Sequence, residues 1–419
     1  MRIFLPIWTI LLISTSALCA PKQLAELTAS DGTENDNFGY AVAMSGNTVV
    51  VGAPNATVDG NVEQGKAYVF VKPESGWGNM TQVAELAPSN GSEYMSFGVS
   101  VAISGDTIIV GTEEINENSI VYVFVKPAGG WKDMTETFQL VGGKLETFVA
   151  IDGNTIVVAS GGIVQVYVAA KGGWAHGAQS SYTLTASDGT SGDDFGSSVA
   201  VSGETVVVGA DSFNNGLGAA YVFVKPAGGW TNMTQTATLT PSNGGDGDNF
   251  GISVSIDSST IVVGAPVDSP DSPPQTAYVF VQPAGGWTNM TETAQLQGTG
   301  SDEEDFGRSV AVLGNRIVVG NPFAIQGQTF QGESYIFTKP KTGWQTTSQF
   351  SAALSASDDK GVNDQFGISV AMSGARIVIG TDKDPISPAL PTSSEDAERL
   401  SKRAAALQIP CAPRVLSLH

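Results

Sequence analysis

The residues best suited to chemistry in this 419-residue sequence are its acids, which number 41 against 20 Lys and Arg. Many acids gather in short segments that precede a recurring Phe-Gly pair. These groups are Asp31, Glu34 and Asp36; Glu93; Asp188, Asp193 and Asp194; Asp246 and Asp248; Asp302, Glu303, Glu304 and Asp305; and Asp358, Asp359 and Asp364. Clustered carboxylates can bind a cationic ligand or, in neighbouring pairs, calcium with low affinity. Turn formation and solubility would explain the same residues without any ligand.

The sequence has few residues that could support other kinds of catalysis. His176 and His419 are the two histidines, which are too few for a His-based triad or a zinc site. Paired carboxylates can hydrolyse glycosidic bonds, but these acids recur copy by copy, whereas a catalytic pair would be unique. We therefore predict a non-catalytic protein without a resident metal or cofactor. A glycoside hydrolase or a lectin-like carbohydrate-binding module is the alternative.

Charge and the N-terminal segment predict the compartment. The net charge of −21 repels phosphate backbones, so nucleic acid is not an expected partner. Residues 1–20 contain Arg2, an apolar run and small residues before Cys19 and Ala20, which is typical of a signal peptide. The apolar run is too short to span a bilayer. We predict a secreted, extracellular protein with no transmembrane segment and, since only Cys411 is certain to remain after cleavage, no intramolecular disulfide.

Seven sequence repeats start at the Phe-Gly pairs. Each unit runs 14 residues from its Phe to the end of a β-branched strand, and this constant offset indicates a hairpin of fixed length. A strand with a Tyr-Val-Phe pattern and a fourth strand after a Gly-Trp turn follow in most units. The unit starts are Phe38, Phe97, Leu145 (in a degenerate copy, Leu145-Glu146), Phe195, Phe250, Phe306 and Phe366.

The Phe-Gly start and the Val-Gly-Ala-Pro end of the units resemble the FG-GAP signature of integrin α-subunit propellers. The signature's end is intact at residues 51–54 and 263–266, and the resemblance covers residues 24–382. It implies an all-β, seven-bladed β-propeller of four-stranded antiparallel blades, in which Phe and Gly-Ala-Pro pack blade against blade. It also implies an adhesion module that binds a protein or glycan. The calcium loops of many such blades are absent, because the turns at that place, such as residues 45–47, have too few oxygen ligands.

The ends of the chain predict how the ring closes. Residues 23–29 look like a fourth strand that completes the seventh unit, whereas no Tyr-Val-Phe strand follows Asp382. We therefore predict a signal peptide at 1–20, a propeller at 21–382 with an incomplete seventh blade, and a partly disordered tail at 383–419. The tail is expected to hold a short helix over 393–407. The protein is expected to be a monomer, although the unpaired edge of the seventh blade is a site for oligomerisation.

Five Asn-x-Ser/Thr sequences make the protein a candidate glycoprotein: Asn55, Asn79, Asn90, Asn232 and Asn289. Asn79, Asn232 and Asn289 are expected on the face opposite the acidic loops. Asn55 and Asn90 fall on the acidic face, but only in the first two units. If all five carry glycans, the acidic face over units three to seven stays bare, and we predict that this surface is the ligand-binding face.

Overall fold

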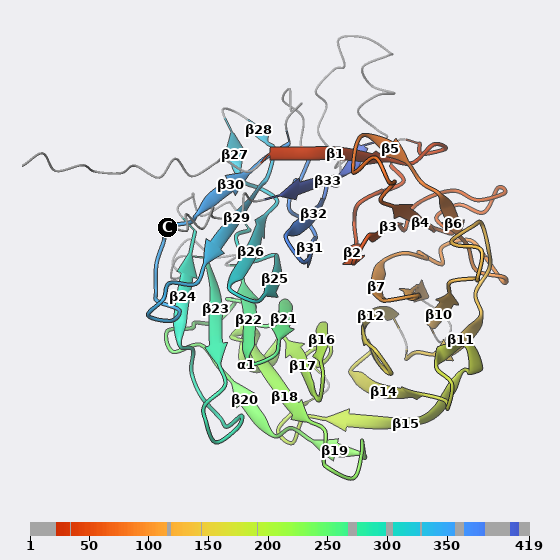
Figure 1. Ribbon diagram of the computed structural model, residues 1–419. Coiled ribbons are helices and arrows are strands. Elements are labelled where there is room, and N and C mark those ends of the chain that lie inside the picture. The colour runs from red at the N-terminus through yellow and green to blue at the C-terminus, as the bar shows by residue number, and fades with distance from the viewer. Residues whose placement is uncertain are drawn as a thin grey trace, which may run out of the picture.

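The computed structural model describes residues 22–33, 35–114, 119–143, 145–190, 192–266, 275–298, 305–326, 329–356, 364–381 and 403–409. The described chain is a ring of antiparallel β-sheets around a central axis (Figure 1). Helix is limited to α1 (Phe213–Gly216) and one 3-10 turn (Trp174–His176) among these residues. Neither they nor any other described segment forms a helix with the length and apolar character needed to cross a membrane. The predicted all-β propeller is confirmed.

Six blades each come from one continuous stretch of chain and contain four antiparallel strands. Blade 1 consists of β2 (Val42–Ser45), β3 (Thr48–Ala53), β4 (Lys66–Val71) and β6 (Ala84–Leu86); blade 2 of β7 (Ser100–Ser104), β8 (Thr107–Gly111), β10 (Ile120–Val125) and β11 (Phe138–Val141); blade 3 of β12 (Leu145–Asp152), β13 (Thr155–Ser160), β14 (Ile163–Ala169) and β15 (Ala178–Thr185); blade 4 of β16 (Ser198–Ser202), β17 (Thr205–Ala210), β18 (Ala219–Val224) and β20 (Ala237–Leu239); blade 5 of β21 (Ser253–Asp257), β22 (Thr260–Ala265), β23 (Thr276–Val281) and β24 (Ala294–Gln297); and blade 6 of β25 (Ser309–Leu313), β26 (Arg316–Asn321), β29 (Glu333–Thr338) and β30 (Ala352–Leu354).

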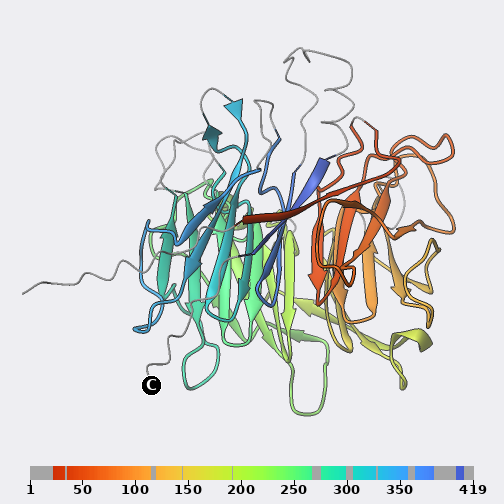
Figure 2. The ribbon, with the colours of Figure 1, turned by 45° about the horizontal axis from the view of Figure 1, so that its top comes forward.

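The last position in the ring holds a composite sheet, which we call the closing sheet. Its order is β31 (Val370–Ser373), β32 (Arg376–Gly380), β33 (Arg403–Ile409) and β1 (Lys22–Thr28), and the short β5 (Met80–Thr81) pairs with β1 in parallel. Figures 1 and 2 show β1 beside β33. The sequence prediction of seven blades is corrected here: six blades are built from one repeat each, and both ends of the described chain join to close the ring.

The C-terminal part of the chain differs from expectation. We expected no third strand after Asp382, yet β33 lies between β32 and β1 and pairs antiparallel with both. The helix predicted over 393–407 is wrong for residues 403–407, which belong to β33. Backbone pairing on both sides stabilises an extended segment in this place, because it satisfies hydrogen-bonding groups that a helix would leave open on β32 and β1. Residues 382–402, 410–419 and the predicted signal peptide lie outside the described part of the chain.

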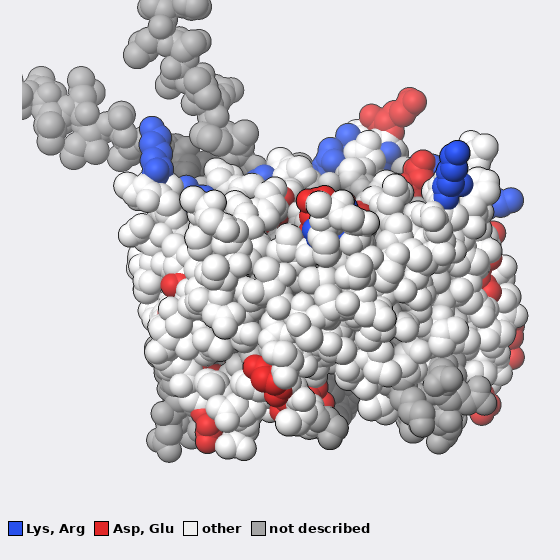
Figure 3. All heavy atoms as spheres, turned by 90° about the horizontal axis from the view of Figure 1, so that it is seen from below, with Lys and Arg blue, Asp and Glu red and all other residues white. Residues whose placement is uncertain are grey.

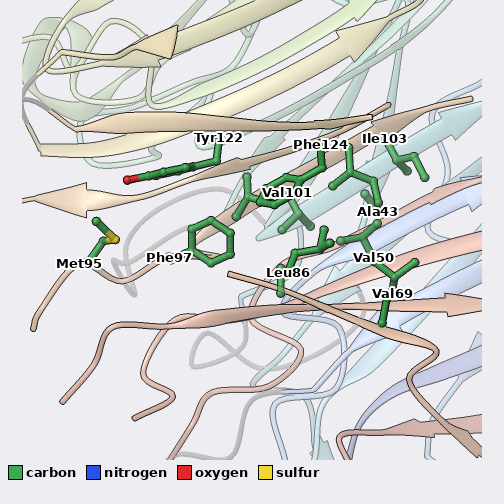
Figure 4. Close-up of a cluster of buried hydrophobic side chains, with 14 residues drawn as sticks. Ala43, Val50, Val69, Leu86, Met95, Phe97, Val101, Ile103, Tyr122 and Phe124 are labelled. Carbon is green, nitrogen blue, oxygen red and sulfur yellow. The ribbon is translucent and has the colours of Figure 1, made fainter. Parts of the chain in front are cut away.

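Aromatic side chains fill the space between neighbouring blades. Between blades 1 and 2, the Phe97 ring lies 5.4 Å from the ring of Tyr122 and 6.1 Å from that of Phe124, edge to face in both cases. Val50 and Leu86 of blade 1 belong to the same buried cluster (Figure 4). Edge-to-face pairs add about 0.5 to 1.5 kcal/mol each beyond the burial of their area. Phe-Gly and Tyr-Val-Phe segments therefore stabilise the ring, as predicted.

At five junctions, a pair of glycines brings the backbones of adjacent sheets together. A Cβ on Gly209, at the end of β17, would lie 2.0 Å from the carbonyl oxygen of Gly251 in the next blade. The same overlap occurs at Gly52 with Gly98, Gly264 with Gly307, Gly320 with Gly367, and Gly380 with Gly39. Ser198 Oγ donates a hydrogen bond of 2.6 Å to the same Gly251 oxygen. The contact requires glycine because no side chain fits between the two backbones.

The turns between first and second strands join the blades a second time. At six junctions a backbone N–H donates to a Ser or Asp oxygen in the turn of the preceding sheet. The bonds are Gly46 to Ser373 (2.9 Å), Gly105 to Ser45 (3.1 Å), Gly153 to Ser104 (3.1 Å), Gly203 to Asp152 (2.6 Å), Ser258 to Ser202 (3.2 Å) and Gly314 to Asp257 (2.5 Å). Leu313 cannot accept such a bond, and there Arg316 Nη2 donates to the Gly374 oxygen at 2.7 Å.

We predict that Gly209→Ala lowers the free energy of unfolding by about 3 kcal/mol, because the added methyl overlaps a backbone oxygen that cannot move alone. Chemical denaturation checks this value. Gly228→Ala is the matched control, since its Cβ would meet nothing within 4 Å, and it should be neutral or slightly stabilising. Equal stability of the two variants would contradict the role assigned to the glycine contact.

Candidate ligand-binding face

The ring has two faces of different charge. The loops between third and fourth strands contain Lys72, Lys126, Lys225 and Lys339, and their backbones bond the turns between first and second strands. We call this side the lysine face and the opposite side, where the loops before each Phe-Gly pair lie, the Phe-Gly face. Figure 3 views the rim: its visible Lys and Arg lie in the upper half together with Asp and Glu, whereas the lower edge shows Asp and Glu without visible Lys or Arg. A cationic partner would thus approach the Phe-Gly face more favourably.

The predicted acids on the Phe-Gly face are in different environments. Asp188, Asp194 and Asp246 are exposed. Asp305 and Asp364 are half-buried. Asp302, Glu303, Glu304, Asp358 and Asp359 lie outside the described residues, as does Glu34. The described acids do not form one cluster: no group of three or more His, Cys, Asp or Glu with metal-binding geometry occurs among them.

Asp193 and Asp248 are buried, with 8% and 1% exposure, and each bonds its own loop. Thr190 donates its backbone N–H to Asp193 Oδ2 at 2.5 Å and its hydroxyl to Oδ1 at 2.9 Å. Asp36 makes the same two bonds with Thr33. These carboxylates hold the loop that leads into the Phe-Gly pair, so their recurrence has a structural cause.

In blade 5 a glycine stands where the threonine would be. Gly245 donates its N–H to Asp248 Oδ2 at 2.6 Å, but Asp248 Oδ1 is buried without a hydrogen-bond partner among the described residues. A Cβ on Gly245 would approach Asp248 no closer than 3.9 Å. The orphaned oxygen thus follows from the missing hydroxyl.

We predict that Gly245→Thr raises the free energy of unfolding by about 1 to 2 kcal/mol, because the new hydroxyl satisfies a buried carboxylate oxygen. Gly245→Ala separates this bond from the entropy of the unfolded chain, which alone accounts for about 0.4 to 1 kcal/mol. Denaturant unfolding of the three proteins measures the difference. If the Thr variant is no more stable than the Ala variant, the hydrogen bond is not formed.

Asp194 approaches a second carboxylate that sequence reasoning missed. Asp211 follows β17, and Asp194 Oδ2 accepts a bond of 2.7 Å from the neighbouring Ser212 hydroxyl. Burial raises the pKa of Asp211, and the charge of Asp194 adds to this increase. The acidic loop and the loop after the second strand thus meet at blade 4, as expected for connections that open on one face.

Blade 3 departs from the repeat on the same face. Leu145 replaces the buried Phe, has φ 74° and is 55% exposed. Strand β12 starts there and pairs with β9 (Glu113–Glu114), so that Glu146 lies directly opposite Glu113. Burial raises the pKa of Glu146 to about 7, with the Glu113 charge as the next cause and Arg308 acting in the opposite direction. Like charges across a strand pair are destabilising.

Three large apolar side chains are exposed around this position. Val141 is 64%, Leu145 55% and Ile163 50% exposed. Ser160 links two of them, because it pairs with Ile163 and its hydroxyl donates to the Leu145 carbonyl at 3.3 Å. Ser119 bonds the segment between Val141 and Leu145. We call Val141, Leu145, Ile163 and Glu146 the blade 3 patch. Sequence reasoning noted the degenerate copy but did not interpret it as a site.

The stability of the fold is predicted to depend on pH through Glu146. Its folded-state pKa of about 7 exceeds the ordinary value of 4.5, so the folded protein binds this proton more tightly. The free energy of unfolding therefore falls as pH rises from about 4.5 to 7, by an amount on the order of 2 kcal/mol.

Glu146→Gln should remove this part of the pH dependence in unfolding experiments at a series of pH values. Glu113→Gln is the matched control, and it should reduce the dependence without abolishing it, because burial of Glu146 persists. An unchanged slope in Glu146→Gln would show that Glu146 ionises normally.

The asparagines of three predicted glycosylation sites join neighbouring sheets by hydrogen bonds on the lysine face. Asn79, Asn232 and Asn289 are exposed, and each Oδ1 accepts a backbone N–H from the outer strand of the preceding sheet at 2.9 to 3.0 Å. Asp133 accepts the same bond at 2.9 Å between blades 1 and 2. An acceptor oxygen is therefore what these junctions require, and glycosylation of the asparagines stays a prediction.

Asn90 and Asn55 lie on the Phe-Gly face. Asn90 is exposed, and its Oδ1 accepts a bond of 2.8 Å from the Tyr122 hydroxyl. Asn243, which is not part of a glycosylation sequence, accepts the equivalent bond from Tyr278 at 3.1 Å. Asn55 is half-buried. His176 is exposed in the 3-10 turn of blade 3.

Five segments of the chain match the FG-GAP repeat family, at residues 21–70, 80–124, 180–223, 233–280 and 349–388. They cover more than half of the sequence, and the chain belongs to this family. Two long intervals have no match: 125–179, which contains β12, β13 and β14 of blade 3, and 281–348, which contains most of blade 6. No match is found among curated protein sequences.

Proposed function

We propose that the chain is a secreted, non-catalytic binding module of the adhesion type, and that it binds an extracellular protein or glycan through its Phe-Gly face. Membership of the FG-GAP repeat family and the propeller fold are compatible with a binding module. The signal-like residues 1–20 support secretion. Neither metal nor cofactor has a part in the proposal.

The observation that carries the proposal is the blade 3 patch. Large aliphatic side chains that are half exposed or more, next to a carboxyl group with a raised pKa, are unfavourable unless a partner covers them. They occur where the sequence has lost its Phe-Gly pair. A position that departs from the sequence repeat without stabilising the fold is better explained by a function than by a structural role.

The chemistry of the patch favours a protein partner over a glycan. Val141, Leu145 and Ile163 offer aliphatic surface, which apolar protein side chains cover well. Glu146 and Glu113 would pair with a Lys or Arg of the partner, and the loss of water on binding would strengthen that pair. The exposed Asp188, Asp194 and Asp246 extend the acidic surface to blades 4 and 5. The protein itself is proposed to act as a monomer.

Arrays of immobilised extracellular-matrix proteins and glycans test the proposal with the purified chain as probe. The variant Val141→Ser, Leu145→Gly, Ile163→Ser removes the apolar surface without creating an Asn-x-Ser/Thr sequence, and Gly tolerates the positive φ of position 145. We expect binding to at least one matrix protein and a loss of at least about tenfold in affinity for the variant.

Val83→Ser is the control variant, because Val83 is 44% exposed but lies outside the patch. It should bind like the unmodified chain. Binding confined to glycans, or equal binding by the triple variant, would contradict the assignment of the patch to a protein partner.

A further inference from the structure

The third strand of the closing sheet differs from that of the other blades. In blades 1, 2, 4, 5 and 6 this strand places Tyr and Phe two residues apart, and both pack against the neighbouring blade. The pairs are Tyr68 and Phe70, Tyr122 and Phe124, Tyr221 and Phe223, Tyr278 and Phe280, and Tyr335 and Phe337. In the closing sheet the register puts Ala406 opposite Ile379 and Gln408 opposite Ile377, at the Tyr and Phe positions respectively.

The last repeat keeps its Phe-Gly phenylalanine, although its third strand has no Tyr or Phe at the positions that would contact that ring. In blade 5, Phe250 lies 5.3 Å from the Tyr278 ring and 6.0 Å from the Phe280 ring. Phe366 is the corresponding residue of the last repeat and is fully buried. Among the described residues, the cluster around Phe366 contains no other aromatic side chain, whereas the cluster of blade 5 has Tyr, Phe and Trp.

The pairing of β33 is also irregular. Its register with β1 shifts at two points within seven residues, between Gln23 and Ala25 and between Leu27 and Thr28. The pairs of third and fourth strands in blades 1, 2, 4, 5 and 6 have no such shift. Strand β33 thus pairs in regular register with β32 but in irregular register with β1.

We propose that this position, between β32 and β1, is a binding site for an extended segment that carries a Tyr-x-Phe pair, and that such a segment displaces β33. Tyr and Phe two residues apart point to the same face of a strand, here the face toward blade 6, where Phe366 lies. The backbone of the segment would pair with β32 on one side and β1 on the other, as in binding by strand addition. This site is independent of the Phe-Gly face.

The third strands of the other blades indicate which sequence would bind at this position. Residues 66–71, Lys-Ala-Tyr-Val-Phe-Val, show the sequence that this position accepts when the register is regular: Ala67 faces Gly52, Tyr68 faces Val51 and Phe70 faces Val49. The equivalent positions of the closing sheet are Gly380, Ile379 and Ile377. A partner segment should therefore present a small residue, then Tyr, then an aliphatic residue, then Phe.

A fluorescent peptide with the sequence of residues 66–71 and added solubilising Lys residues tests the proposal on the full chain. We expect saturable binding by fluorescence anisotropy, and binding at least about tenfold weaker for the peptide with both aromatic residues changed to Ser, since each aromatic pair contributes to affinity. Hydrogen exchange should show residues 403–409 losing protection while residues 377–380 and 25–28 keep it. Absence of binding, equal binding of the two peptides, or unchanged protection of 403–409 would overturn the proposal.

A variant of the chain gives a second readout. Ala406→Tyr with Gln408→Phe supplies the missing rings in place, so it should raise the melting temperature and weaken peptide binding at least about tenfold. Ala405→Ser is the matched control, because blade 6 has Ser334 at the equivalent position, and it should leave both values unchanged. A double variant that binds the peptide as well as the unmodified chain would contradict the assigned position.

Discussion

The approach of two backbones at five of the seven junctions between sheets sets the geometry on which the rest of the ring depends. Where Gly209 meets the carbonyl of Gly251, no Cβ separates the strands. This closeness lets Ser198 reach the same carbonyl oxygen, and it places the Phe of one blade against the aliphatic residues of the blade before it. A wider junction would leave voids around the rings, which close-packed interiors do not tolerate. The distance between blades is therefore a property of the glycines, and the aromatic packing follows from it.

Most of the fold could be predicted from the sequence because its repeat is local. Phe-Gly, the β-branched strand and the strand with Tyr and Phe two residues apart recur together in blades 1, 2, 4, 5 and 6, so one of these blades explains the other four. The closing sheet could not be predicted in the same way, because β33 has the sequence Arg-Ala-Ala-Ala-Leu-Gln-Ile. It has no alternation and only one β-branched residue, Ile409, and its local preference is helical. Pairing with β32 and β1 outweighs that preference, and pairing partners distant in sequence have no local signal.

The candidate site shows a similar division. The acids before each Phe-Gly pair were visible in the sequence, but Asp193 and Asp248 proved to be buried supports of their loops, a role that only the hydrogen bonds reveal. In the sequence, the turns between first and second strands were notable only because they are too short to bind calcium. In the structure, their Ser and Asp residues accept hydrogen bonds that join the blades. By contrast, Leu145 and Glu146 carried a signal, since they interrupt a repeat that is otherwise regular. Exposure of Val141 and Ile163 beside them had no such signal.

Ring closure by the two ends of the chain also affects how the protein must be made. Strand β1 is among the first described segments to leave the ribosome, yet its partner β33 lies some 380 residues later. At ordinary synthesis rates the interval between them is roughly 20 to 80 s. Throughout that time the blades can form one after another, but β1 has no third strand to pair with. The nascent chain thus carries an open edge beside β1 until β33 has been synthesised, and such an edge favours aggregation unless a chaperone covers it.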